Sequence, residues 1–165
     1  MTQRTKISED ILNDCVYARY KKDACYLRAA EFVSGQNDEY VYNGKFYIKE
    51  PCHISGTGHF NAVDAIICIN QLGFSGLGFL IKEKGLYMPY EDYLTNYNNV
   101  LIGQVEKLRF RKPVDPQNVY GETTERHKVM SGKLFAKGII KFFDDTNGLC
   151  EGAYSWVFNL KNDGI

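Results

Sequence analysis

One stretch constrains the fold more than any other, the uncharged run from Ala65 to Ile81. A polar, glycine-rich segment at residues 50–64 leads directly into it and contains two histidines and an asparagine. Such a run predicts a long helix that is buried on most of its sides. It falls just short of the usual transmembrane length and contains Asn70 and Gln71. We therefore expect the buried helix of a soluble fold and no membrane span.

Helical spacing divides this helix into three stripes. The first two are mostly apolar and consist of Val63, Ile67, Asn70, Phe74, Leu77 and Ile81, and of Ala62, Ile66, Ile69, Gly73, Gly76 and Leu80. The third is narrow and polar and consists of Asp64, Cys68, Gln71 and Ser75. Two apolar stripes predict burial on most sides, and the small residues of the second would allow close approach of a sheet or helix.

Length and composition favour one soluble globular domain over residues 1–165, with residues 1–23 as an N-terminal helical extension. Ser8 is a candidate N-cap for a helix that runs to about Tyr20. The 20 basic and 20 acidic residues cancel, which argues against a nucleic-acid or anionic-membrane partner. No apolar signal segment opens the chain, and the five cysteines form no CxxC pair. We expect reduced thiols, no metal site and a cytoplasmic protein.

Strand patterns surround the long helix. Residues 24–33 are expected to form one strand, and the Asn43-Gly44 pair between residues 40–42 and 45–48 predicts a tight hairpin closed by Pro51. Residues 83–99 read as a loop with a short helix at 90–97. Three more strands are expected at residues 100–111, 133–143 and 152–160. The expected fold is α+β, a long antiparallel sheet with one central helix.

This order resembles the hotdog fold, in which a curved antiparallel sheet wraps around a long central helix. Residues 108–116, LRFRKPVDP, look like the "RFRRPVxPGD" strand end of hotdog dehydratases and thioesterases, with Gln117-Asn118 in place of the usual Gly-Asp. Residues 51–64, PCHISGTGHFNAVD, with CINQ at 68–71, are similar to the turn and helix start of the FcoT-like long-chain fatty acyl-CoA thioesterases.

The resemblance implies that His53, Asn61 and Asn70 hold the positions of that family's functional groups. The family tends to have a tyrosine where His53 stands, which leaves open whether position 53 does acid–base work or only holds substrate. Hotdog proteins are dimers or larger assemblies with the thioester between protomers. The resemblance therefore also implies a homo-oligomer whose site borrows residues from a second chain.

Thioester chemistry needs a polarised carbonyl and a group that delivers or orients a nucleophile. Free backbone N–H groups from Gly58 to Asn61, aided by the helix dipole, would bind an oxyanion. Ordinary capping, with Thr57 as N-cap, is the structural alternative. His59 and His53 flank the turn and are candidate bases, with structural hydrogen bonding as their alternative role.

Two asparagines and a carboxylate complete the catalytic candidates. Asn61 would hold a water or the thioester oxygen, or else cap the helix. Asn70 lies in an apolar stripe, where an amide needs a partner, either structural or substrate. In a regular helix the two would face nearly opposite sides, so Asn61 must belong to the turn or the site must span two protomers. Asp64 is a candidate base or nucleophile, or else a solvated or paired carboxylate.

Substrate contacts are expected from Gly58, Phe60, Phe74, Arg109 and Arg111. The arginines, with Lys112 and Lys133, would meet the phosphates of coenzyme A or the arm of an acyl carrier protein; a solvated strand edge is the alternative. No GxSxG, GxGxxG or GxxxxGK sequence is present, so neither a serine nucleophile nor a nucleotide cofactor is implied. We expect no cofactor beyond the coenzyme A or phosphopantetheine that holds the substrate.

The resulting hypothesis is an enzyme that acts on fatty acyl-CoA or acyl-ACP, most simply a thioesterase. The resemblance also covers relatives in isonitrile lipopeptide pathways that add glycine to a 2-enoyl-ACP thioester, which makes glycine a second candidate substrate. A non-catalytic acyl- or ACP-binding protein is the alternative from another class. A dehydratase is a weaker alternative, because no Pro-Gly follows either histidine in the manner of HxxxxPG.

Overall fold

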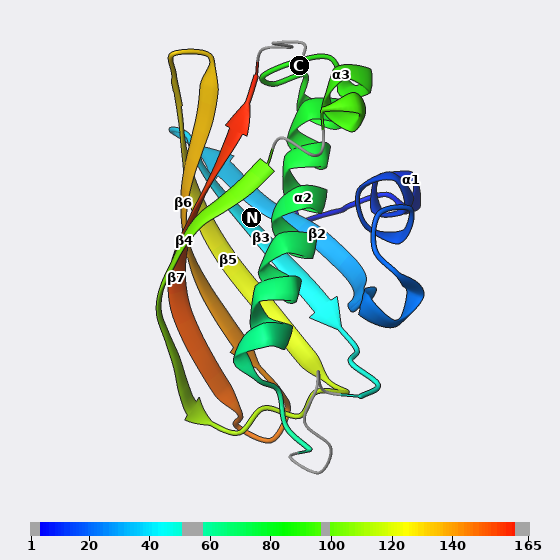
Figure 1. Ribbon diagram of the computed structural model, residues 1–165, viewed down its shortest axis with the longest axis vertical. Coiled ribbons are helices and arrows are strands. Elements are labelled where there is room, and N and C mark those ends of the chain that lie inside the picture. Colours follow the sequence, from blue (N-terminus) through cyan, green and yellow to red (C-terminus); the bar gives the residue numbers. More distant parts are fainter. Residues whose placement is uncertain (1–3, 51–57, 97–99, 161–165) are drawn as a thin grey trace.

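The computed structural model describes residues 4–50, 58–96 and 100–160, with residues 100–102 described by their backbone alone (Figure 1). Its centre is one antiparallel sheet in the order β1-β2-β3-β5-β6-β7-β4. The sheet curves around the long helix α2, Ala62–Lys84. The strands are β1 Thr5–Lys6, β2 Leu27–Gln36, β3 Glu39–Phe46, β4 Val100–Lys112, β5 Val119–Met130, β6 Lys133–Phe143 and β7 Leu149–Asn159. The expected hotdog architecture is confirmed.

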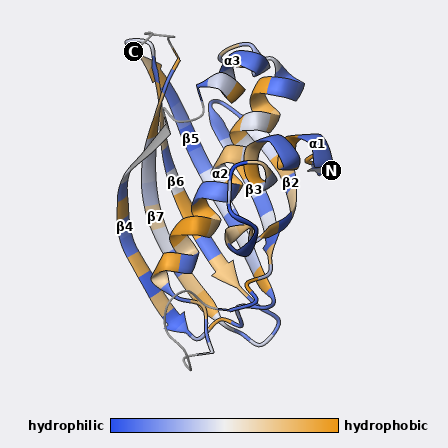
Figure 2. Ribbon diagram, turned by 45° about the vertical axis from the view of Figure 1, so that its right-hand side comes forward, coloured by the Kyte–Doolittle hydropathy of each residue, from blue (hydrophilic) through white to orange (hydrophobic). Residues whose placement is uncertain are grey.

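The long strands alternate buried and exposed residues, as a sheet with one covered face requires. Figure 2 shows the matching alternation of hydrophobic and hydrophilic bands. The predicted strands at 100–111, 133–143 and 152–160 are confirmed as β4, β6 and β7, although β7 starts three residues earlier. The expectation of only three strands there was wrong, because β5 lies between β3 and β6 in the middle of the sheet.

The hairpin predicted at Asn43-Gly44 was wrong. Both residues lie inside β3, and the β2–β3 turn is made by Asn37 and Asp38 at φ angles of 53° and 61°. Asparagine and aspartate tolerate this left-handed conformation. Gly44 is required in the strand for another reason: a Cβ there would lie 2.9 Å from the Phe46 ring. Pro51, expected to close the hairpin, lies outside the described residues.

Helix α2 is buried on the side that the sequence marked as polar. Asp64, Cys68, Gln71 and Ser75 are fully buried, whereas Val63 and Ile66 are 47% and 36% exposed. The side-chain amide of Gln71 explains much of this reversal, because its Oε1 accepts from the backbone N–H groups of Tyr26 and Leu27 at 2.9 Å. Its Nε2 donates to Ala24 O. The polar stripe of the sequence is therefore buried, and the hydrogen bonds of the Gln71 amide are satisfied by backbone groups.

The N-terminal segment packs on α2. It consists of α1 Glu9–Leu12, a π-helical turn Asn13–Tyr17 that continues α1 directly, and a 3₁₀ turn Lys22–Ala24, so the helix predicted to about Tyr20 is present but becomes π-helical and ends at Tyr17. Ser8 precedes α1 without a side-chain capping bond. Gly78 of α2 permits the contact, since a Cβ there would lie 2.7 Å from the Cys15 sulfur. The short helix expected near residue 90 is confirmed as α3, Tyr90–Thr95.

By length and composition alone, α2 is long and apolar enough to cross a membrane. However, 78% of its most apolar window is buried inside the domain. Its length is therefore explained by its role as the core helix of this sheet.

Candidate active site

The start of α2 is an ordinary, well-formed helix cap. Asn61 is the N-cap residue, and its Oδ1 accepts from the N–H groups of Val63 at 2.9 Å and Asp64 at 3.2 Å. The Asp64 carboxylate accepts in return from the Asn61 N–H at 3.3 Å. This reciprocal pair is a capping box. Asn61 and Asp64 are therefore committed to the helix terminus, while the Asn61 Nδ2 is buried without a hydrogen-bond partner.

Residues 58–60, which precede the cap, are held against the segment that follows β4. Gly58 has a φ of 62°, which favours glycine, and both Gly58 and His59 are exposed. Phe60 is fully buried against Phe142, and its N–H donates to Val114 O at 3.0 Å. A pocket of about 330 Å³ opens here, lined by His59, Phe60, Asn61, Ala62, Phe110, Arg111, Lys112 and Pro113. Thr57 and His53 lie outside the described residues.

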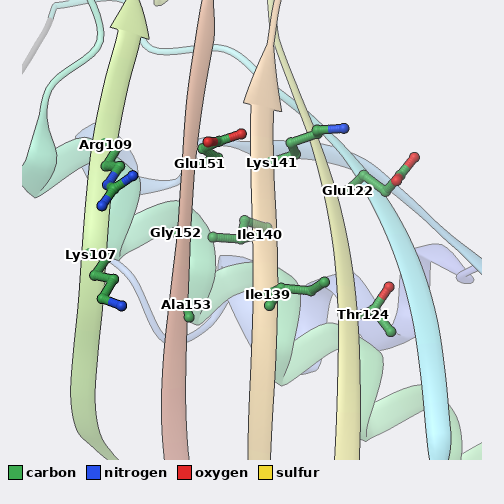
Figure 3. Close-up of a pocket in the computed structure, with 10 residues that line it drawn as sticks. All are labelled: Lys107, Arg109, Glu122, Thr124, Ile139, Ile140, Lys141, Glu151, Gly152 and Ala153. Carbon is green, nitrogen blue, oxygen red and sulfur yellow. The ribbon is translucent and has the colours of Figure 1, made fainter.

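The remaining predicted residues lie in two different places, on α2 and on the outer face of the sheet. Asn70 is half-buried on α2, and no hydrogen bond joins its side chain to another described residue. Phe74, one turn further on, is also half-buried. Arg111 pairs with Glu151 at 2.9 Å on the outer face of the sheet. Arg109 lines a shallow pocket of about 440 Å³ on the same face, away from α2 (Figure 3).

The cysteine thiols in the described part of the chain have no features of activated nucleophiles. Cys15, Cys25, Cys68 and Cys150 are buried and unpaired by disulfides. Burial raises the pKa of Cys15 to about 11 and that of Cys150 to about 12. Within the described residues, no three His, Cys, Asp or Glu side chains are grouped as metal ligands. Nucleophilic thiol chemistry is therefore disfavoured at these positions.

A polar cluster lies between α2 and the middle of the sheet. The Glu125 side chain on β5 is fully buried and accepts three hydrogen bonds. The Tyr154 hydroxyl and the Trp156 Nε1–H donate to its Oε1 at 2.6 and 3.0 Å, and His127 Nε2 lies 3.0 Å from its Oε2. These partners come from β5 and β7, because the register places Glu125 opposite Gly138 and Gly138 opposite Tyr154.

The cluster extends to either side of Glu125 along β5. On one side, the Tyr87 hydroxyl lies 2.9 Å from His127 Nδ1 and 3.3 Å from the Tyr40 hydroxyl. On the other, the Tyr154 hydroxyl lies 2.7 Å from Thr123 Oγ1. The interior cluster, by which we mean Tyr40, Tyr42, Tyr87, Thr123, Glu125, His127, Tyr154 and Trp156, therefore links β3, β5, β7 and the loop after α2.

Two glycines of α2 allow the helix to lie against this cluster. A Cβ at Gly73 would be 3.6 Å from Glu125 Oε1, and a Cβ at Gly76 would be 2.8 Å from the Tyr42 ring. The Tyr42 hydroxyl is fully buried and has no hydrogen-bond partner among the described residues. Burial, followed by the charge of Glu125, raises its pKa well above the usual value. An unpaired buried hydroxyl is costly, so this position is a candidate contact for a bound polar group.

No residue of β5 was among the sequence-based candidates. In the structure, Val119, Gly121, Thr123, Glu125 and His127 are buried and alternate with more exposed residues, but three of these five inward residues are polar, so the sequence lacks the usual apolar alternation. A period of two indicates a strand even where its inward positions are polar. What the alternation cannot reveal is that Glu125 and His127 face inward, because their partners are 29 to 40 residues away in the sequence.

A curved antiparallel sheet around one long helix defines a hotdog-fold protein. Two solved structures share this arrangement, a chain of a dehydratase heterocomplex from Xenorhabdus doucetiae (TM-score 0.55) and a protein from Syntrophus aciditrophicus assigned as a thioesterase (TM-score 0.52). Both are 11% identical and cover 90% of this chain, which in turn covers 90% and 94% of theirs. At that identity they establish the fold alone.

The chain belongs to the FcoT-like thioesterase domain family, whose model matches residues 15–158. Relatives named (2E)-enoyl-ACP glycyltransferase are similar over most of their length. The protein from Mycobacterium tuberculosis H37Rv is 28% identical, covering 88% of this chain and 84% of that protein. The protein from Streptomyces coeruleorubidus is 28% identical, covering 92% and 98% respectively.

Proposed function

We propose that this protein is a cytoplasmic enzyme that acts on fatty acyl thioesters and adds glycine to a 2-enoyl thioester held on an acyl carrier protein. The observation that carries this proposal is the similarity, at 28% identity, over 84% and 98% of the length of two relatives named for that reaction. Hydrolysis of an acyl thioester is the second candidate, and the description of the family itself favours it. Neither reaction needs a cofactor beyond the carrier's own phosphopantetheine or coenzyme A.

The structure supports an assignment of Asn70 as the amide that contacts the substrate. Its side chain is half-buried in an apolar part of α2 and makes no hydrogen bond to another described residue. An amide N–H directed at the thioester oxygen would stabilise the enolate of glycine addition or the oxyanion of hydrolysis. Asn61 is then the cap alone, which removes the difficulty of placing two asparagines nine residues apart in one site.

The acyl chain is proposed to lie along α2 between two protomers. Val63 and Ile66 are exposed there, next to the half-buried Ile67, Asn70 and Phe74, and β4 ends the sheet nearby without a further strand in the described chain. A second copy covering this face would bury the apolar stripe and enclose Asn70. Arg111 and Lys112, at the end of β4, are proposed contacts for the carrier's phosphate.

Mass spectrometry of intact carrier protein tests the proposal. Wild-type protein is incubated with 2-enoyl-ACP and 2-enoyl-CoA of several chain lengths, with and without glycine. Glycine addition is expected to increase the carrier mass by one glycine, whereas hydrolysis returns free carrier whatever the glycine concentration. Asn70→Ala serves as the control that ties turnover to this protein. Unchanged thioester under every condition would reject both reactions and favour a non-catalytic acyl- or ACP-binding protein.

A further inference from the structure

The interior cluster contains a titratable pair, Glu125 and His127, to which the proposed reactions assign no role. The Glu125 and His127 side chains are 0% and 1% exposed and 3.0 Å apart. Purely structural polar pairs of this kind also occur, so the arrangement of protons around them decides what the pair is able to do.

The neighbours of Glu125 identify it as an ionised acceptor. The Trp156 indole is able only to donate. Burial, the charge of Glu125 and their mutual hydrogen bond all raise the pKa of Tyr154, so its phenol keeps its proton and donates as well. With both donors on Oε1, the remaining oxygen accepts from His127, whose Nε2 therefore carries a proton. The Nδ1 atom is then the nitrogen that gains or loses a proton.

The Tyr87 hydroxyl makes that change possible without breaking the cluster. It has one proton and two acceptors within reach, His127 Nδ1 at 2.9 Å and the Tyr40 oxygen at 3.3 Å. With neutral His127, Tyr87 donates to Nδ1. When Nδ1 is protonated, it donates to Tyr87, and the tyrosine proton turns to Tyr40. The hydrogen bond between Tyr87 and His127 is therefore kept in both states.

Aromatic rings and carboxylates surround His127. The rings of Tyr40, Trp156 and Tyr87 lie 4.8, 5.4 and 5.7 Å from the imidazole. The nearby carboxylates are Glu125 and Asp38, whose charges act on Tyr87 as well. The other ionisable groups beside Glu125 are Tyr42 and Tyr154, while the helix above contributes Gly73. No described hydrogen bond joins a lysine or arginine to this cluster.

Tyr87 also connects the Glu125–His127 pair to the protein surface, so that a proton is able to pass between them. It is half-buried and has a φ of 71°, a conformation that is costly for an aromatic residue. It follows the C-cap of α2, Gly85, at a φ of 65°. The strained turn brings its hydroxyl to His127. Burial and the Tyr40 bond raise its pKa, so it transfers protons as a neutral phenol and does not ionise itself.

Along the axis of α2, the interior cluster also lies close to Asn70, the proposed substrate contact. Gly73, which packs on Glu125, is three residues after Asn70, or about 4.5 Å along the helix axis. Asn61, at the cap, is a further nine residues back, roughly 14 Å from Asn70 along the axis. The polar interior is therefore closer to Asn70 than the helix start is.

We propose that His127, Glu125 and Tyr87 form an internal proton-transfer site, in which His127 Nδ1 receives a proton through the Tyr87 hydroxyl. The proposal rests on the proposed function. In glycine addition a C–N bond forms at the β-carbon, the amine gives up a proton, and the α-carbon gains one. In hydrolysis a C–O bond forms, the C–S bond breaks, and the proton of the attacking water passes to sulfur. In both cases His127 holds the proton between the two steps, and Glu125 is a positioning residue that acts through it.

Nitrogen-15 NMR of histidine-labelled protein tests proton uptake directly, with His127→Gln used to assign the signal. The wild-type imidazole is expected to show the Nε2–H tautomer at high pH and reversible protonation of Nδ1 as the pH is lowered. A His127 signal that keeps one protonation state across the range would overturn the proposal.

Steady-state kinetics test whether the proton is used. His127→Gln is expected to lower kcat by about 100-fold with little change in KM, and Tyr87→Phe by at least about tenfold. Trp156→Phe is the matched control, because it removes a buried hydrogen bond to Glu125 without removing a group from the proton path. It is expected to lower stability while preserving the pH profile of kcat. Equal loss of kcat in Trp156→Phe and His127→Gln would show a structural cluster and overturn the proposal.

The two failures are distinguishable. If wild-type protein turns over the thioester but His127→Gln retains its kcat and pH profile, the proton-transfer site is wrong and the proposed function stands. If wild-type protein transforms no thioester, the proposed function is overturned together with the catalytic use of the proton. The NMR titration then still decides whether His127 Nδ1 takes up a proton.

Discussion

The start of α2 and the interior cluster both place polar and acidic groups beside a histidine, but the partners of those groups differ. At the helix start, Asn61 and Asp64 bond to backbone groups within three residues of themselves. In the cluster, Glu125 bonds to side chains from a different strand. The first pattern is a local cap, whereas the second requires the whole fold. Polar residues next to a helix start are therefore weaker evidence of function than polar residues that the fold brings together.

The largest expected difference between the two regions is in stability. Glu125→Ala leaves the Tyr154, Trp156 and His127 donors buried and unpaired, and we expect it to lower the free energy of unfolding by about 3–5 kcal/mol. Asp64→Ala removes half of a capping box and is expected to cost about 1 kcal/mol. Urea denaturation followed by circular dichroism measures both. Equal losses would mean that the cluster is not the more tightly coupled region.

Close approach of α2 to the cluster is tested by two glycines. Gly76→Ala places a methyl group 2.8 Å from the Tyr42 ring, and this overpacking is expected to cost about 1–3 kcal/mol. Gly73→Ala makes ordinary contact at 3.6 Å and removes a poor helix former, so it is expected to be neutral or stabilising by up to about 1 kcal/mol. Thermal unfolding of the pair gives the comparison. A stable Gly76→Ala protein would argue against the described packing.

The cap itself is tested at Asn61. Asn61→Ala removes the acceptor for two N–H groups and is expected to cost about 1 kcal/mol of unfolding free energy. Asn61→Ser supplies another good capping oxygen and is expected to restore most of that loss. Chemical denaturation of both variants at neutral pH distinguishes them. Failure of serine to restore stability would mean that the amide does more than cap.

The anchor of the helix start is expected to respond to acid. Asp144 accepts from the N–H groups of Asp115, Thr146 and Gly148, and Asp115 follows Val114, which binds Phe60. Burial opposes ionisation of Asp144, but these hydrogen bonds outweigh it and lower its pKa.

Because the folded pKa of Asp144 is lowered, its stabilisation is complete above the unfolded value of about 3.9 and is lost as pH falls through the folded pKa. Asp144→Asn should therefore be less stable than wild type at pH 7 and lose less on acidification. Denaturation curves from about pH 2 to pH 7 measure this, and parallel pH dependences would contradict it.

Much of the fold was predictable from local patterns. The uncharged run gave α2, and alternation gave β4, β6 and β7, because these elements bury apolar residues with their own periodicity. The features that the local patterns did not predict share another cause. β5 turns Thr123, Glu125 and His127 inward, and α2 turns Gln71 inward, because residues distant in sequence satisfy them. Asn43-Gly44 is a good turn sequence that packing of Phe46 holds in a strand.

The candidate site was predictable in part for the same reason. The resemblance selected the start of α2 and Asn70 from sequence alone, and the structure adds that Asn61 and Asp64 are engaged in a capping box. The interior cluster could not be assembled beforehand, because Tyr87, His127 and Trp156 meet only through the sheet register and the turn after α2.

Turnover by one pair of variants tests most directly whether the substrate contact lies at Asn70 or at the helix start. On 2-enoyl-ACP with glycine, we predict that Asn61→Ser, which preserves the cap, keeps kcat within about twofold of wild type. Asn70→Ala, which removes the proposed substrate contact, is predicted to lower kcat by about 100-fold. A large loss in Asn61→Ser together with wild-type turnover in Asn70→Ala would place the chemistry at the helix start and contradict the assignment of Asn70.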